Sequence, residues 1–197
     1  MIVFEFSNSA MQIKRPLLVL CFLVFFAPTT VLAEIQLFGD NPIFSAIKAN
    51  DLEGVKAAVA RGEKPEIEDF DGRNPLIYAG IIGNADVIDY LAKIPVSINH
   101  RDKLGNSALY YAADQGHIDA VEALLESGAA IDTENRRGLT PLMAAAGQGK
   151  IEILRILLEK GADATRRDYT GRTALMWSEW NRKRQASKIL RAAGVRE

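Results

Sequence analysis

The chain has 197 residues, of which 48% are hydrophobic and 25% are charged. These values are typical of one globular domain with a packed core, and they exclude a disordered or membrane-embedded chain. The formal net charge of -1 gives no overall signal for binding to nucleic acid or to an anionic membrane. Any electrostatic argument therefore depends on how the charges are distributed along the chain.

The N-terminus has the pattern of a secretory signal peptide. Lys14 and Arg15 precede an apolar run over 17–27, and Val31 and Ala33 occupy the -3 and -1 positions of a cleavage site. The apolar run is shorter than the roughly 20 residues that span a bilayer. We therefore expect cleavage after Ala33 and no integral membrane insertion of the mature chain. An uncleaved signal that anchors the protein is the alternative.

Cys21 is the only cysteine, and it lies inside the apolar run. The preceding residues, Leu18 to Leu20, lack the small residue of a lipoprotein signal, so we expect no lipid on this cysteine. After cleavage the mature chain has no disulfide or thiolate chemistry, and its stability must come from packing. Met11 begins a signal of more usual length than Met1 does, and both starts stay open.

Three series of residues recur every 33 positions without an insertion or deletion, which indicates a repeat protein. The first series is Gly39, Gly72, Gly105, Gly138 and Gly171; the second is Gly62, Pro95, Gly128, Gly161 and Gly194; the third is Asn50, Gly83, Gly116, Gly149 and Arg182.

Each cycle predicts two short helices. A residue that can accept hydrogen bonds from free helix amides begins each cycle, and Pro or Ala follows at the first helical position. The first helix ends at the third series, and the second helix, over 151–159 in the fourth cycle, ends at the second series. Neither helix reaches the roughly 12 residues of a marginally stable isolated helix, so the cycles must stack. The predicted N-caps are Asn41, Asn74, Ser107, Thr140 and Thr173.

The segments 140–146, reading TPLMAAA, and 157–163, reading LLEKGAD, resemble the ankyrin repeat, and the third cycle repeats both. The resemblance implies an all-α solenoid of about five helix-turn-helix repeats with projecting β-hairpin turns. Asn50 and Arg182 depart from the pattern in the first and last cycles, as end caps do. Pro95 also departs, which puts the loop after Ile94 in doubt. The expected organisation is a signal peptide over 1–33, a lead-in over 34–40, and a repeat domain over 41–197, with cycles starting at 41, 74, 107, 140 and 173.

Residues suited to catalysis are few. His100 and His117 are the only histidines, and no close ligand spacing joins them to Asp102 or Asp119. We therefore predict no catalytic residues, no metal and no cofactor. A metal-dependent enzyme is a remote alternative.

The resemblance implies that partners contact the hairpin tips and the exposed side of the first helices, which line a concave surface. The corresponding positions are Phe70, Arg73, Ile81, Ile82, Leu104, Asp114, Gln115, Arg136, Arg137, Leu139, Tyr169 and Trp180. The large apolar residues of this set are expected to form one exposed strip, as protein-binding sites often do. The alternative is that Ile81 and Ile82 pack onto neighbouring hairpins. Trp177, by contrast, is expected in the core.

Charge is segregated along the repeats. Residues 34–134 carry 8 basic and 18 acidic side chains, whereas residues 135–197 carry 14 basic and 6 acidic side chains. Arg184, Lys188 and Arg191 share one face of the final helix by their spacing. This face is either a polar end cap or a docking site for an acidic partner or for phospholipid headgroups.

These features predict a monomeric, non-catalytic module that binds one or more proteins and no nucleic acid. Exported proteins that resemble it are associated with protecting or positioning other exported proteins, so the resemblance implies a scaffold or protective partner in the periplasm of a Gram-negative bacterium. A secreted effector that binds host proteins is the alternative.

Overall fold

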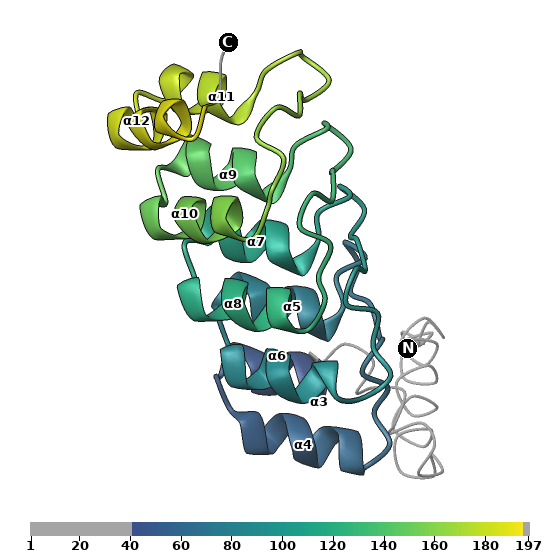
Figure 1. The fold of residues 1–197 in the computed structure, drawn as a ribbon. Helices are drawn as coiled ribbons and strands as arrows, with labels where there is room; N and C mark the ends of the chain where they lie inside the picture. Colours follow the sequence, from purple (N-terminus) through teal and green to yellow (C-terminus); the bar gives the residue numbers. More distant parts are fainter. Residues whose placement is uncertain (1–40, 195–197) are drawn as a thin grey trace, which may run out of the picture. The chain divides into compact units, whose positions relative to one another are not determined.

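The computed structural model describes residues 41–194, so the predicted signal peptide lies outside the described residues. Ten helices of the described chain stack in two columns (Figure 1). The first helices of the repeats are α3 (Pro42–Lys48), α5 (Pro75–Ile82), α7 (Ala108–Gln115), α9 (Pro141–Gln148) and α11 (Ala174–Trp180). The second helices are α4 (Leu52–Ala60), α6 (Ala85–Ala92), α8 (Ile118–Glu126), α10 (Ile151–Glu159) and α12 (Arg184–Ala192).

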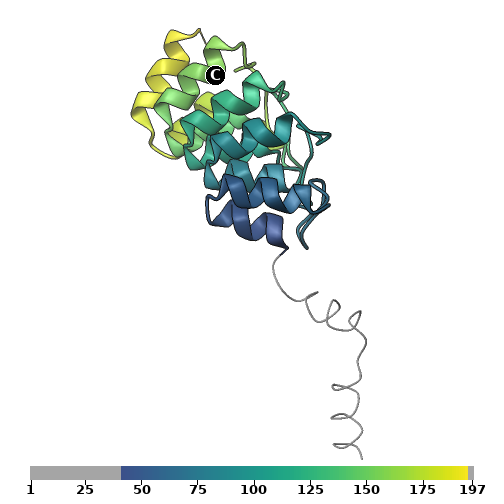
Figure 2. The same ribbon diagram turned by 90° about the horizontal axis from the view of Figure 1, so that it is seen from below.

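Each helix contacts the next helix of its own column and the other helix of its own repeat. Figure 2 shows the same stack from below, from α4 to α12. Between 41 and 194 the structure contains no strand, and a single antiparallel bridge joins Arg101 and Ser107. The predicted all-α repeat solenoid is confirmed, and its projecting turns are hairpins with almost no regular β-pairing.

The five predicted N-caps all accept a hydrogen bond at the start of a first helix. Asn74 accepts from the backbone N–H of Ile77 at 2.9 Å, and Thr140 accepts from Met143 at 3.3 Å. Ser107 and Thr173 bond in the same way, and Asn41 accepts from the backbone N–H two residues later, at Ile43. These helices have only seven or eight residues. Each cap satisfies one of the four N–H groups that have no partner inside the helix, which matters more in a helix this short.

The residue after each first helix, or one position beyond it, takes a left-handed conformation. Gly83 has a φ of 91°, and Asn50 and Arg182, which replace Gly in the end repeats, have φ values of 54° and 57°. They are the two non-glycine residues with positive φ in the described chain. A side chain in this region costs about 1 to 2 kcal/mol, so the end repeats keep the turn at some cost in stability.

Pro95 changes the end of α6. Four repeats close the second helix with a positive-φ glycine, such as Gly161 at 89°, followed by a bond from Ala162 N–H to the Leu157 carbonyl in that cycle. In the second repeat Val96 N–H instead bonds to the Ile94 carbonyl at 2.7 Å. The loop after Ile94 therefore has a different structure from the corresponding loops of the other four repeats.

The core runs along the whole stack between the two columns. One continuous cluster of buried side chains extends from Ile43 to Leu190. Leu142 on α9 and Leu154 and Leu157 on α10 are fully buried in it. Since each repeat contributes only one layer, no repeat has a core of its own, and neighbours stabilise one another.

Candidate protein-binding surface

The hairpin tips of successive repeats are joined by backbone hydrogen bonds. Lys103 N–H donates to the Asp71 carbonyl at 2.9 Å, and Arg136 and Tyr169 donate to the carbonyls of Leu104 and Arg137, each at 3.0 Å. Each tip is thus held by its neighbour. The exposed side chains on the tips therefore lie on hairpins that are connected to one another, not on independent loops.

One Asp or Asn side chain stabilises the turn of each hairpin. One oxygen of Asp69 accepts two backbone amides, from Asp71 and Arg73, each at 2.8 Å. Asp102, Asn135 and Asp168 accept the amides two and four residues later in the same way. These four residues stand three positions before the glycines of the first 33-residue series.

The second oxygen of each aspartate accepts from an aromatic side chain on the following first helix. Tyr78 and Tyr111 donate their hydroxyls to Asp69 and Asp102 at 2.8 and 2.6 Å. The indole of Trp177 donates to Asp168 at 2.9 Å. The fourth repeat has Ala144 at this position, so its hairpin has no such aromatic anchor.

These bonds change the acidity of the turn carboxylates. Burial alone would raise the pKa of Asp168, but hydrogen bonds from Thr170, Arg172 and Trp177 outweigh it and hold the pKa below its usual value. In Asp69 burial is likewise outweighed by bonds from Arg73, Tyr78 and Asp71, and the pKa is lowered. Both carboxylates therefore stabilise the hairpins in the charged form.

Five of the six exposed large hydrophobic residues in the described chain belong to the set predicted from the sequence. Phe70 is 90% exposed and Trp180 is 70% exposed, and Ile82, Leu104 and Tyr169 are also exposed. Ile118, at the start of α8, is the sixth and was not predicted. Gln115, Arg136 and Arg137 are exposed as expected, while Arg73 and Asp114 are partly buried. The binding role of these residues stays a prediction.

Two predictions about the apolar strip need correction. Leu139 is 7% exposed and belongs to the core cluster, because it stands at the base of its hairpin, directly before the N-cap Thr140. Ile81 is partly buried and packs against the core. The strip is therefore not continuous: hairpin tips supply Phe70, Leu104 and Tyr169, and first helices supply Ile82 and Trp180.

The prediction that Trp177 belongs to the core is only partly right. Its ring packs against the core cluster but is partly exposed. The guanidinium carbons of Arg137 and Arg172 lie 5.9 and 5.7 Å from this ring, and that of Arg172 lies 4.7 Å from the ring of Trp180. Two arginines and two tryptophans therefore form one cluster on the fourth and fifth repeats.

The arginines of this cluster have no carboxylate partner among the described residues. No carboxylate between 41 and 194 lies within ion-pairing distance of Arg136, Arg137 or Arg172. Arg172 donates to the Thr170 hydroxyl at 2.7 Å, and its guanidinium carbon lies close to the rings of both tryptophans. Guanidinium groups arranged in this way can bind a carboxylate through two parallel hydrogen bonds.

A hollow of about 290 Å³ lies beside this cluster. Its floor is α9, where Ala144 and Gly147 stand at the positions that carry Tyr111 and Asp114 in the third repeat. Trp177 forms one wall, and Tyr110 forms the other. The sequence analysis did not predict the hollow. A signal for it was present: Tyr78, Tyr111, Ala144 and Trp177 are spaced 33 residues apart, and only Ala144 has a small side chain.

The lining of the hollow includes the polar side chains of Asp114, Gln148, Arg137 and Asn181. Asp114 accepts from the side-chain amides of Gln148 and Gln115, each at 2.9 Å. Burial, followed by the nearby Asp114 carboxylate, raises the pKa of Tyr110 to about 12, so its hydroxyl keeps its proton. This hydroxyl makes no hydrogen bond with another residue of the described range.

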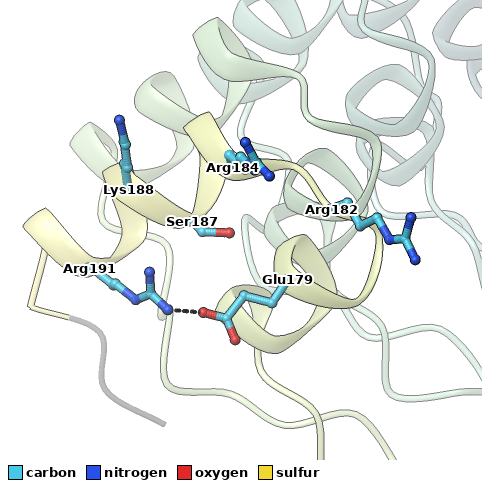
Figure 3. Close-up of a pocket in the computed structure, with 6 residues that line it drawn as sticks. All are labelled: Glu179, Arg182, Arg184, Ser187, Lys188 and Arg191. Atoms are coloured by element: carbon cyan, nitrogen blue, oxygen red, sulfur yellow. Dashed lines mark hydrogen bonds and ion pairs between the residues drawn. The ribbon is translucent and has the colours of Figure 1, made fainter.

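A larger hollow, of about 630 Å³, lies on the final repeat between α11 and α12 (Figure 3). Arg184, Lys188 and Arg191 line it, as their helical spacing predicts. Arg191 is paired with Glu179, and Figure 3 shows Lys188 pointing away from this pair. The cations of this basic face do not converge on one point.

The side chains of both histidines lie within hydrogen-bonding distance of backbone carbonyls. His100 Nε2 is 2.9 Å from the Gly72 carbonyl, and His117 Nε2 is 3.0 Å from the Ile81 carbonyl. Each one therefore links its own repeat to the preceding repeat. Among residues 41–194 no group of three or more potential metal ligands comes together.

The comparison with protein families agrees with this architecture. The family model for ankyrin repeats in three copies matches residues 43–135 and 127–196. The chain belongs to the ankyrin-repeat family, whose members are protein-binding modules. A comparison with curated proteins finds no match. Within the described residues no helix is both long and apolar enough to cross a bilayer.

Proposed function

We propose that this protein is a non-catalytic binding module that holds or protects another protein in the bacterial periplasm. The observation that carries this proposal is the set of exposed side chains on the hairpin tips and first helices. Trp180 and Phe70 are largely exposed, although a monomer gains no stability from exposing them. Exposed aromatic residues beside unpaired arginines are the residue types that dominate binding energy in protein interfaces.

The export part of the proposal is supported by the N-terminal sequence. Lys14 and Arg15, the apolar run over 17–27 and Ala33 have the order and spacing of a cleavable signal. The lack of any cysteine after Cys21 is compatible with an oxidising compartment, since no thiol is exposed to oxidation.

A binding rather than a catalytic role is supported by how the reactive side chains are used. His100 and His117 bond to backbone carbonyls of the preceding repeat. The buried carboxylates Asp102 and Asp168 accept backbone amides at their hairpins. Groups that hold a turn in one geometry are poorly suited to exchange protons with a substrate.

The proposal is tested by affinity capture from a periplasmic extract of the producing cell, followed by mass spectrometry of the retained proteins. The protein as found in that cell serves as bait, with Trp180→Ala and Arg155→Ala as paired variants, because Arg155 is exposed on the opposite column at α10. We expect a partner that is retained by the Arg155 variant and lost from the Trp180 variant. Equal retention by both variants contradicts binding through this surface, and recovery of the protein only from the medium favours the secreted effector.

A further inference from the structure

The hollow on α9 and the arginine–tryptophan cluster beside it are one site. Trp177 belongs to both, since it lines the hollow and its ring lies 5.9 and 5.7 Å from the guanidinium carbons of Arg137 and Arg172. A methyl group built on Gly147 would lie 3.9 Å from Trp177 and 3.1 Å from the amide nitrogen of Asn181. Gly147 thus lets Asn181 approach α9 closely, and the small side chain of Ala144 leaves the hollow open beside Trp177.

We propose that this site binds a short acidic segment of a partner protein, with an Asp or Glu carboxylate on Arg137 and Arg172 and a neighbouring apolar side chain in the hollow. The inference deepens the proposed binding function and depends on it.

Charge complementarity selects the carboxylate. Arg137 and Arg172 have no acidic partner in the described chain, and residues 135–197 carry 14 basic and 6 acidic side chains. Asp114 lies across the hollow from Trp177 and is already bound by Gln148. An acidic group therefore has one favourable side, at the arginines, which fixes the direction in which a segment can lie.

The size of the hollow selects a side chain rather than a larger ligand. Its volume of about 290 Å³ is at the lower limit of sites for drug-sized molecules, roughly 300 to 1,000 Å³. Met143, Leu139 and Ala144 provide an apolar floor. The side chains of Gln148 and Asn181 at its edge supply amide donors and acceptors for the backbone of the segment.

Ala144→Tyr is the variant that tests the hollow most directly. Two other repeats carry a tyrosine at the equivalent position, so we expect the fold to accept one here. Tyr78 and Tyr111 stand at the equivalent positions, and each reaches the turn carboxylate of its own hairpin. A tyrosine at 144 should reach Asn135, where its hydroxyl can accept the second N–H of the side-chain amide whose first N–H donates to Asn106. It should leave the melting temperature unchanged or raised, and fill the hollow. Arg137→Gln removes the cation from an exposed position, and Arg155→Gln on α10 is the matched control.

The experiment selects a random heptapeptide library, displayed on phage, against the protein purified from the producing cell. Selected peptides are then titrated while tryptophan fluorescence is recorded. Trp177 and Trp180 are the only two tryptophans, so the signal reports on this site alone. We expect peptides with an Asp or Glu beside a large apolar residue, and at least a tenfold loss of affinity in the Ala144 and Arg137 variants but not in the Arg155 variant.

The inference is overturned by peptides without acidic residues, by a selection that yields no binder, or by binders that the Ala144→Tyr variant retains. A random single-stranded DNA oligonucleotide that binds through Arg137 also overturns it in favour of a nucleic acid. If the inference fails while capture of a protein partner still depends on Trp180, the proposed binding function stands. If capture also fails, both are wrong.

Discussion

The indole nitrogen of Trp177 donates a hydrogen bond to Asp168 at 2.9 Å, and Tyr78 bonds to Asp69 in the equivalent place in the second repeat at 2.8 Å. The two pairs differ in one chemical respect. A tyrosine hydroxyl can donate or accept, whereas an indole N–H can only donate.

This difference predicts unequal effects of the same substitution. Asp69→Asn should cost about 1 kcal/mol or less, because Tyr78 can accept from the new amide. Asp168→Asn should cost about 1 to 3 kcal/mol, because either Trp177 or a backbone amide loses its acceptor. Urea unfolding of both variants measures the difference, and equal losses would show that the indole bond adds nothing to stability.

The same carboxylates predict acid sensitivity. The pKa of Asp69 and that of Asp168 are both lowered in the folded state, so their stabilising effect is complete above the unfolded pKa, about 3.9. It is lost as pH falls below that value through the folded pKa. Unfolding free energies should therefore drop as pH falls below about 4, and the drop should be smaller in Asp168→Asn. A drop of the same size in that variant would assign the acid sensitivity to other groups.

The left-handed residue at the end of α11 predicts a stabilising substitution. Arg182 has a φ of 57°, where glycine avoids a steric cost of about 1 to 2 kcal/mol but brings more entropy to the unfolded chain. Arg182→Gly should raise stability by about 0.5 to 1 kcal/mol. Asn50→Gly should gain less, since Asn tolerates this conformation better. Thermal unfolding of the two variants tests the order, and a loss of stability in Arg182→Gly would mean that its side chain stabilises the end repeat.

Interior and surface positions should differ strongly in stability. Leu142 is fully buried between neighbouring repeats, so Leu142→Ala should cost about 2 to 5 kcal/mol through the cavity it leaves. Arg155→Ala, on an exposed side chain, should cost less than about 0.5 kcal/mol. Similar losses at the two positions in denaturant unfolding are incompatible with the stacked core.

Most of the fold follows from the sequence because each element has a local chemical cause. Thr140 and Asn74 cap helices in the structure as their side chains and positions predict. Gly83 ends a helix with positive φ for the same reason. Such local signals, repeated at a fixed interval, fix the register of every helix without knowledge of long-range contacts.

The site was less predictable, because exposure depends on neighbours from other repeats. Leu139 and Leu104 both belong to hairpins, yet one is 7% and the other 61% exposed. The difference lies in whether the residue stands at the base or at the tip of the turn. The hollow on α9 is lined by the small residues Ala144 and Gly147, and the position of Trp177 in three dimensions is needed before they are recognised as part of a hollow.

The two tryptophans should differ in how much they contribute to folding, although both lie at the proposed binding surface. Trp180 is 70% exposed, so Trp180→Ala should change stability by less than about 0.5 kcal/mol and weaken partner binding by about 2 kcal/mol or more. Trp177→Ala should lower stability by about 2 to 3 kcal/mol, since it loses packing and the bond to Asp168. Calorimetric melting measures the change in stability of each variant, and titration against the captured partner measures the change in affinity.

The central claim is that the hairpin and first-helix surface holds a protein partner in the living cell, and site-specific photocrosslinking tests it most directly. A benzophenone amino acid replaces Trp180 in one strain and Glu159, exposed on α10, in another, and intact producing cells are irradiated. The account predicts a discrete higher-mass adduct from position 180, absent from position 159 and abolished by Arg137→Glu. An adduct from position 159 alone, or no adduct from position 180, would contradict the claim.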